Sequence, residues 1–337
     1  MGILKYFIYC LSAIIFTSCY EIFSPDVEAP PVLCISSLIK AGEKMKIEVT
    51  HTWVYSDFDA MQNHEVKDAV ISIFANDILV DNDYIPKEGD RIRIYAESKK
   101  FGNAVAETEV PFSTSIKISD CEINMLSRNI FSDENFNINI FLYFNLFVKI
   151  EISDVSDLTD YYHISFKTYD IMSPLSGDLK DPDYFNDYYF YFSGGYLDYD
   201  AEPLFYENAE EFESIYGSPT GFNFFTDKLF SGGTYTLNLV FLDCAFHYQA
   251  DEWNPDFLDC GKMITLNTIS KSYYDWEYYY HYIDTGILND MTYWGFIDPI
   301  WGYSNVSTGA GVVAAESSNY VILNLREKLE NILGIKD

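Results

Sequence analysis

The chain has 337 residues, of which 48% are hydrophobic and 18% aromatic, so it is long enough for two domains and too apolar to be disordered as a whole. Its 21 basic and 52 acidic residues give a net charge of −31, which repels phosphate backbones and excludes nucleic acid as a partner. The acidic excess lies late in the chain, because residues 121–337 hold 10 basic and 34 acidic residues, a net charge of −24.

The first 18 residues are typical of a secretory signal peptide. Lys5 precedes an apolar run from Phe7 to Phe16 that is shorter than the ~20 residues needed to span a membrane. The run leads into FTSC, ending at Cys19, which resembles a bacterial lipobox apart from Phe16, where Leu is usual. We expect cleavage before Cys19 and a lipid anchor of palmitate-type chains on its sulfur, with plain secretion as the alternative.

Residues 19–31 are expected to form an extended tether, since they contain three prolines, three acidic residues and no basic one. Acidic residues soon after the lipidated cysteine also resemble the surface-export signals of Bacteroidetes lipoproteins. The predicted location is therefore the outer membrane, with the chain lipid-anchored and facing the cell surface.

Residues 32–114 are predicted to form a small immunoglobulin-like or transthyretin-like β sandwich. Runs rich in β-branched residues are separated by turn residues such as Asn76 and Asp77. Met45, Ile47 and Val49 alternate with polar residues, which indicates a half-buried strand. The predicted strands are 32–38, 44–50, 69–74, 90–96 and 104–111.

Residues 115–337 are predicted to form a larger β sandwich or barrel-like domain with one short helix, so that the chain is mainly all-β. The helix is expected at 270–283 (SKSYYDWEYYYHYI), because Ser270 or Ser272 can cap it and its aromatic residues recur at helical spacing. The predicted strands are 138–152, 161–169, 188–192, 235–246, 263–266 and 320–325.

Five parts of the chain, in order, resemble one family of Bacteroidetes outer-membrane lipoproteins, domain-of-unknown-function family 4249. They are the FTSC motif; VLCISSLIKAGEKMKIEVTHT; the pair VKDAVISIFAND and IPKEGDRIRIYAES; FTDKLFSGGTYTL; and DPIWGYSNVSTGAGVVAA. In the last part, the family's signature turn falls on Ser304, Asn305, Gly309 and Gly311. Val306 and Val313 stand where the family usually has Ile and Phe.

This resemblance implies a cell-envelope lipoprotein whose biochemistry is not established. It implies a non-enzymatic accessory or binding partner of a TonB-dependent outer-membrane transporter in nutrient uptake. The alternative is a structural or adhesive surface protein that binds host or matrix ligands. The small molecule or peptide that the chain would bind is not specified by the resemblance.

Two further groups of residues are candidates for a structural or binding role. Cys244 and Cys260 lie at the ends of two predicted strands and form the candidate disulfide, with buried free thiols as the alternative. The aromatic and Asp-rich stretch 183–200 is a candidate partner surface, unless its rings fill the β core. Its tyrosines are Tyr184, Tyr188, Tyr189, Tyr191, Tyr196 and Tyr199.

No catalytic, cofactor or metal site is predicted. His64-Glu65 lacks the second histidine of a zinc-protease motif, and no G-x-S-x-G elbow is present. The loop that contains Asp154 and Asp160 does not follow the ligand order of an EF-hand. The signature SN pair is interpreted as a turn, because serine and asparagine bond their own backbone and the following glycines permit positive φ or close approach of another strand.

Overall fold

The computed structural model describes residues 30–52, 64–132, 138–154, 158–169, 185–187, 203–206, 223–249, 261–284 and 302–333. Strands dominate this part of the chain, and it contains two α-helices, α3 (Lys271–Asp284) and α5 (Arg326–Leu333). The predicted all-β class and the predicted helix are therefore confirmed, whereas α5 was not predicted. Val32–Thr52 and Asn63–Asp337 belong to one compact unit.

A five-stranded sheet has the order β14-β6-β5-β3-β4. Its strands are β3 (Val70–Ala75), β4 (Ile78–Val80), β5 (Arg91–Ser98), β6 (Gly102–Glu109) and β14 (Val306–Ser307). The predicted turn at Asn76 and Asp77 joins β3 to β4, and both residues have positive φ (52° and 65°), as a two-residue hairpin of this type requires. The pairing of β14 with β6 brings a segment from near the end of the sequence into a sheet of early strands.

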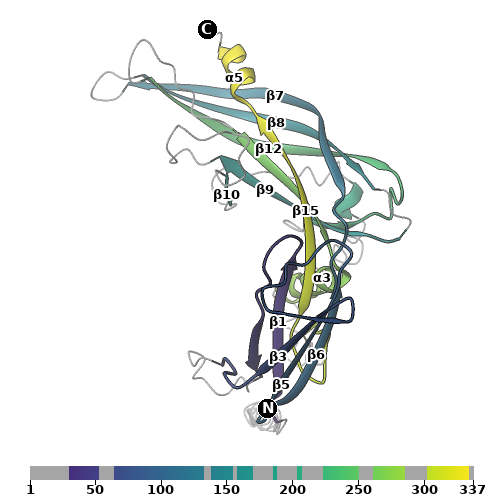
Figure 1. Cartoon of the computed structure of the whole chain (residues 1–337). Coiled ribbons are helices and arrows are strands. Elements are labelled where there is room, and N and C mark those ends of the chain that lie inside the picture. The colour runs from purple at the N-terminus through teal and green to yellow at the C-terminus, as the bar shows by residue number, and fades with distance from the viewer. Residues whose placement is uncertain are drawn as a thin grey trace, which may run out of the picture. The chain divides into compact units, whose positions relative to one another are not determined.

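A seven-stranded sheet runs β10-β9-β13-β15-β1-β2, with β11 also paired to β9. Its strands are β1 (Leu33–Lys40), β2 (Glu48–His51), β9 (Tyr161–Tyr169), β10 (Phe185–Asp187), β11 (Phe224–Thr226), β13 (Gly261–Ile269) and β15 (Val313–Asn324). In Figure 1, β15 is the long yellow strand that lies beside β1. It pairs parallel to β1 through 313–316 and antiparallel to β13 through 316–324.

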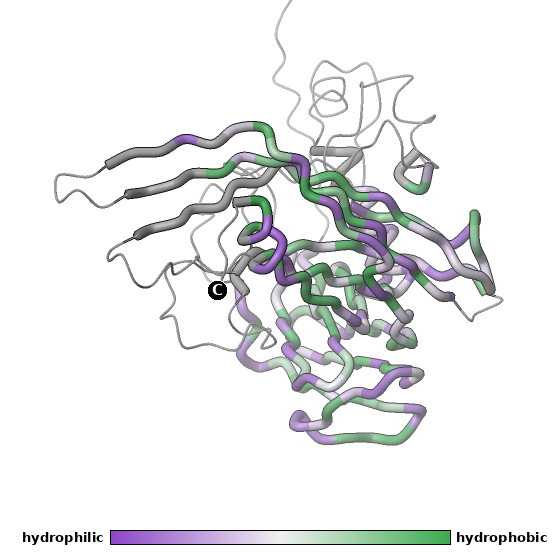
Figure 2. The backbone as a smooth tube through the Cα atoms, turned by 90° about the horizontal axis from the view of Figure 1, so that it is seen from above, coloured by the Kyte–Doolittle hydropathy of each residue, from purple (hydrophilic) through white to green (hydrophobic). Residues whose placement is uncertain are grey.

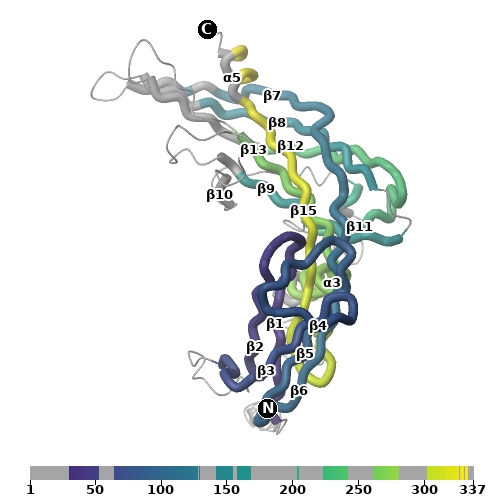
Figure 3. Tube along the Cα trace, in the orientation of Figure 1, coloured from purple at the N-terminus to yellow at the C-terminus, as the bar shows by residue number. Residues whose placement is uncertain are grey.

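A three-stranded antiparallel sheet, β12-β8-β7, completes the described framework. Its strands are long: β7 (Ser115–Ser132), β8 (Ile138–Ser153) and β12 (Thr234–Gln249), traced in teal and green in Figure 3. In β8 every second residue from Leu142 to Ile152 is buried, as expected for a strand with one buried face, and hydrophobic residues recur along the coloured parts of these strands (Figure 2). A short 3-10 helix, η2 (Pro203–Tyr206), places Leu204 in the hydrophobic core that contains the buried residues of β8 and β12.

Two main hydrophobic cores lie between these sheets, and β15 contributes to both. Val313 and Ala315, at its start, pack in a core with residues of β1, β3, β5 and β6. Leu323, near its end, packs in a second core with residues of β8, β9, β12 and β13. The predicted boundary at residue 114 stays a prediction, but the sheets themselves join residues on both sides of it.

Several strands differ from their predicted bounds. β15 begins at Val313 rather than at residue 320, and β13 covers Gly261–Ile269 rather than 263–266. The predicted strand at 188–192 lies outside the described residues. β2 begins at Glu48 rather than at residue 44, although Met45 and Val49 are both buried as the alternation indicated. β7 was not predicted individually, because its pairing with β8 slips twice, between Ile118 and Asp120 and between Met125 and Ser127. Each bulge shifts the in–out alternation by one residue, so no single period of two runs through the strand.

His163 of β9 lies on the same face of the seven-stranded sheet as Phe224 of β11, with which it pairs. Its ring stacks on Phe224, with centroids 4.3 Å apart and an interplanar angle of 10°. Its Nδ1 lies 3.3 Å from Nδ2 of Asn267 on β13. Burial lowers the pKa of His163 to about 4, so the imidazole is neutral at neutral pH.

The free energy of unfolding should therefore fall as pH drops from about 6.5 to about 4. In this range His163 is protonated in the unfolded chain but stays neutral in the folded chain. The loss attributable to this residue is on the order of 3 kcal/mol. His163→Phe keeps a ring against Phe224 and cannot be protonated. Urea unfolding at pH 7, 5 and 4 should show a smaller loss for the variant, and equal losses in both proteins would contradict this account.

Candidate functional site

The structure describes only some of the residues that the sequence analysis predicted to have a functional or structural role. Cys19, Cys260 and all six candidate tyrosines, Tyr184, Tyr188, Tyr189, Tyr191, Tyr196 and Tyr199, lie outside the described residues. Cys244 pairs with Tyr143 across β12 and β8, and because Cys260 is not described the disulfide stays a prediction. Cys34 and Cys121 are free thiols. The four residues of the signature turn are all described, and they lie together against β1 and β6.

The turn is closed by the side chain of Asn305. Its Nδ2 donates to the carbonyl of Val313 at 2.7 Å, and its Oδ1 accepts from the amide of Val313 at 2.9 Å. Ser304 Oγ accepts from the amide of Val306 at 3.2 Å, which starts the turn in the way the sequence indicated. The Asn305 carboxamide therefore pairs with the backbone of Val313, the first residue of β15, as the backbone of a neighbouring strand would.

The two glycines let this turn lie directly on β1. A Cβ on Gly309 would lie 2.5 Å from the carbonyl oxygen of Leu33, and one on Gly311, whose φ is +108°, would lie 2.2 Å from that of Ile35. The close approach allows two backbone hydrogen bonds between the turn and β1. The amide of Ile35 donates to the carbonyl of Ala310, and the amide of Ala310 donates to the carbonyl of Leu33, each at 2.9 Å. The turn interpretation of the signature thus agrees with the observed contacts, and the glycines are required by strand packing.

The FTDKLFSGG segment also builds a turn, between β11 and β12. Asp227 is 1% exposed, and its Oδ1 accepts from the amide of Asp160 at 3.0 Å. Its own carbonyl accepts from the amide of Phe230 at 2.7 Å. Asp154 Oδ2 accepts from the amide of Gly232, which has a positive φ of 65°. Two of the five segments that carry the family resemblance, FTDKLFSGG and the signature turn, therefore form structural turns.

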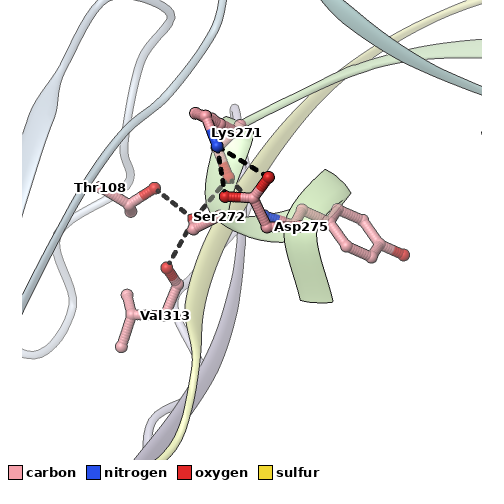
Figure 4. A network of polar contacts seen from close by, with 7 residues as sticks. Thr108, Lys271, Ser272, Asp275 and Val313 are labelled. Carbon is pink, nitrogen blue, oxygen red and sulfur yellow. Dashed lines mark hydrogen bonds and ion pairs between the residues drawn. The ribbon is translucent and has the colours of Figure 1, made fainter. Parts of the chain in front are cut away.

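Helix α3 is attached to β15 through its first residues. Ser270 caps the helix, since its Oγ accepts from the amide of Tyr273 at 3.3 Å, and the same oxygen accepts from the amide of Ala315 at 3.0 Å. Ser272 Oγ donates to the carbonyl of Val313 at 3.0 Å and lies 3.4 Å from Thr108 Oγ1 (Figure 4). The carbonyl of Val313 thus joins the signature turn and α3.

This attachment leaves α3 with two aromatic faces. Tyr274 and Tyr278 stack on each other at 6.4 Å and pack toward β9 and β11 in a small aromatic core. Tyr273, Trp276 and Tyr280 form a second row, with centroids 6.3 and 5.8 Å apart, and Tyr273 at its start also contacts Phe224 of the aromatic core. Trp276 is 37% exposed and Tyr280 54% exposed, so this second face is presented to solvent.

A cavity of about 550 Å³ opens beside the second aromatic face. Tyr273, Trp276 and Glu277 line it from α3, Leu38 lines it from β1, and Tyr303 lines it from the segment that leads into the signature turn. Gly311 and Val312 contribute to the wall, so the turn that holds the sheets together also shapes the cavity. Residues from three distant parts of the sequence meet there.

The electrostatics of the cavity are dominated by acidic groups. Burial raises the pKa of Glu277 to about 7, and this carboxylate forms no hydrogen bond or ion pair with any residue that the structure describes. Burial, followed by the charge and hydrogen bond of Asp275, raises the pKa of the Tyr303 phenol. The nearest lysine on the helix, Lys271, is occupied by Asp275, with Nζ–Oδ distances of 2.7 and 2.5 Å (Figure 4).

The described residues thus define an all-β protein whose signature turn supports an aromatic cavity, and comparison of the sequence assigns its family. The sequence model of the family "Domain of unknown function (DUF4249)" matches residues 20–319, and the chain belongs to this family. No curated protein and no solved structure matches the chain. Within the described ranges, no helix is long and apolar enough to cross a membrane, and no group of three or more His, Cys, Asp or Glu residues could hold a metal ion.

Sequence reasoning missed the cavity. Its candidate partner surface at 183–200 stays a prediction, because the six tyrosines there lie outside the described residues. The signal was present in the helix, because Tyr273, Trp276, Glu277 and Tyr280 recur at i, i+3, i+4 and i+7, while Tyr274 and Tyr278 form a different stripe. A helix that packs on a sheet buries only one stripe. The second stripe was therefore a predictable exposed aromatic surface.

The signature turn yields a direct test. Gly311→Ala forces a Cβ into the Ile35 carbonyl at a positive φ, so we expect a loss of roughly 2–4 kcal/mol in the free energy of unfolding. Gly302→Ala is the matched control, because no atom lies within 4 Å of the added Cβ. Urea denaturation of both variants measures the effect. Equal stability of the two variants would show that β1 does not lie against the turn.

Proposed function

We propose that the chain is a non-enzymatic, lipid-anchored lipoprotein of the Bacteroidetes outer membrane that captures a ligand beside a TonB-dependent transporter. The anchor rests on FTSC at Cys19, and the transporter partnership rests on the family resemblance. The observation that carries ligand capture is the cavity beside α3. Ser270 and Ser272 attach this helix to β15 by hydrogen bonds, and the helix presents aromatic side chains and one unpaired carboxylate to the cavity. Concave, preformed sites lined by aromatic rings and a few polar groups are typical of ligand binding.

A protein partner requires a surface of its own, and we propose the outward face of β8 for the transporter. Tyr143 is 41% exposed and Phe147 is 38% exposed, four residues apart on the same face of the strand. Leu126, 53% exposed, lies in the β7 bulge next to the residue that pairs with Tyr143. Exposed apolar side chains grouped in this way are typical of interaction surfaces.

The anchor is tested at Cys19. The full chain expressed in a bacterial host with lipoprotein processing should incorporate labelled palmitate and sediment with outer membranes. Cys19→Ala should abolish labelling and release the protein from the membrane, because a single lipidated residue supplies the attachment. Cys34→Ala is the control, since Cys34 lies in β1. Labelling that persists in Cys19→Ala would contradict the proposed anchor.

The partnership is tested by a crosslinked pull-down of the intact lipoprotein from native outer membranes, read by mass spectrometry. We expect a stoichiometric TonB-dependent transporter, and we expect Tyr143→Ser with Phe147→Ser to reduce its recovery about tenfold, because interface aromatics supply much of the binding energy. Ile78→Ser, at an exposed apolar residue in β4, is the control. Recovery of the lipoprotein alone from membranes that contain transporters would contradict the partnership and favour the adhesive alternative.

A further inference from the structure

We propose that the cavity beside α3 binds an organic cation, namely an ammonium group carried on a small apolar body, with the rings of Tyr273, Trp276 and Tyr303 around the cation and Glu277 as its counter-charge. The inference rests on the proposed capture function and specifies the chemical class of what is captured. It follows from the lining, the volume and the charge of the cavity.

The lining supplies aromatic faces from two separate elements. Tyr273 and Trp276 come from α3, and Tyr303 comes from the segment before the signature turn. Aromatic rings attract ammonium groups electrostatically, and cages of several rings are the common way in which proteins hold quaternary ammonium ligands. The volume of about 550 Å³ lies within the range of small-molecule sites.

The charge of the cavity calls for a positive ligand. Glu277 is withdrawn from water and forms no ion pair within the described residues, which is why its pKa lies near 7 rather than in the ordinary carboxyl range. The lysine of α3 and the lysine of β1 are both ion-paired already, Lys271 with Asp275 at 2.5 Å and Lys40 with Glu316 at 2.9 Å. An ammonium group in the cavity would supply the missing counter-charge.

Other ligand classes fit the cavity less well. Asp275 and Glu316 are neutralised by Lys271 and Lys40, so the unpaired charge that an anionic ligand would meet is the negative one of Glu277, and a phosphate or carboxylate would be repelled. A neutral sugar or alcohol could contact the rings, but it would leave Glu277 either ionised without a counter-charge or protonated, whereas a cation pairs with the ionised form. The cation is therefore the occupant that satisfies both the rings and the carboxylate.

The test uses choline and its neutral isostere dimethylbutanol, in which a tert-butyl group replaces the trimethylammonium. Calorimetric titration of the purified full chain in detergent at pH 7.5 should give a choline Kd of about 1 mM or tighter, and binding of the isostere at least about tenfold weaker. Glu277→Gln and Trp276→Leu should each weaken choline binding about tenfold. Glu327→Gln, at an exposed residue of α5, is the control.

Proton uptake and release separate the proposed role of Glu277 from a merely structural one. Choline should bind more tightly at pH 8 than at pH 6, and near pH 7 it should expel a proton, measured by titration in buffers of different ionisation enthalpy. Other titratable groups are Tyr273 and Tyr303, which line the cavity, and Asp275 and Glu316, which lie near these rings. The single substitution Glu277→Gln should nevertheless be enough to abolish the proton release. This variant should fold, because it replaces an unpaired buried carboxylate with a neutral isostere.

Two results would overturn the proposal. Equal affinity for choline and its isostere would show that charge plays no part in the cavity. Absence of any heat or tryptophan fluorescence change up to about 50 mM choline would show that the cavity is not a cation site. Both results are independent of the transporter pull-down, which concerns the outward face of β8 and can succeed or fail separately.

Discussion

The parallel pairing of β1 with β15 is the constraint on which the rest of the structure depends. Parallel neighbours require the chain to cross from one to the other, and here the crossing spans nearly the whole sequence. The start of β15 fills one hydrophobic core and its end fills the other. Gly309 and Gly311 make the pairing sterically feasible, because any side chain there would meet the backbone of β1.

The same contact determines where binding chemistry can occur. The carbonyl of Val313 accepts from Asn305 and from Ser272, so the signature turn and α3 are joined at one atom. Ser270 adds a second attachment to Ala315. As a result, α3 and the segment that carries Tyr303 are both attached to β15 beside the cavity. A preformed site of this kind loses little conformational entropy on binding.

Much of the framework could be predicted from local sequence patterns. The remaining features could not, and each for a physical reason. The strand at 161–169 and the helix capped by Ser270 were predicted correctly, because their signals lie within one segment. β7 was not predicted, because two bulges interrupt the alternation of buried and exposed residues along the strand. The cavity escaped prediction because it brings together Leu38, Trp276 and Tyr303, whose proximity depends on strand pairings that no local pattern encodes. The signature glycines were correctly interpreted as a turn, but their partner strand was not identified.

Hydrogen exchange at peptide resolution on the full chain tests the central claim most directly. The amides of Ile35 and Ser37 donate to Ala310 and Val312 at 2.9 and 3.0 Å, so β1 should exchange slowly. We predict that peptides from β1 and from β13 lose protection together, because β15 joins them in one cooperative sheet. Rapid exchange in β1 while β13 stays protected would show that the early strands and the late sheet are not bound by this pairing, and it would contradict the account.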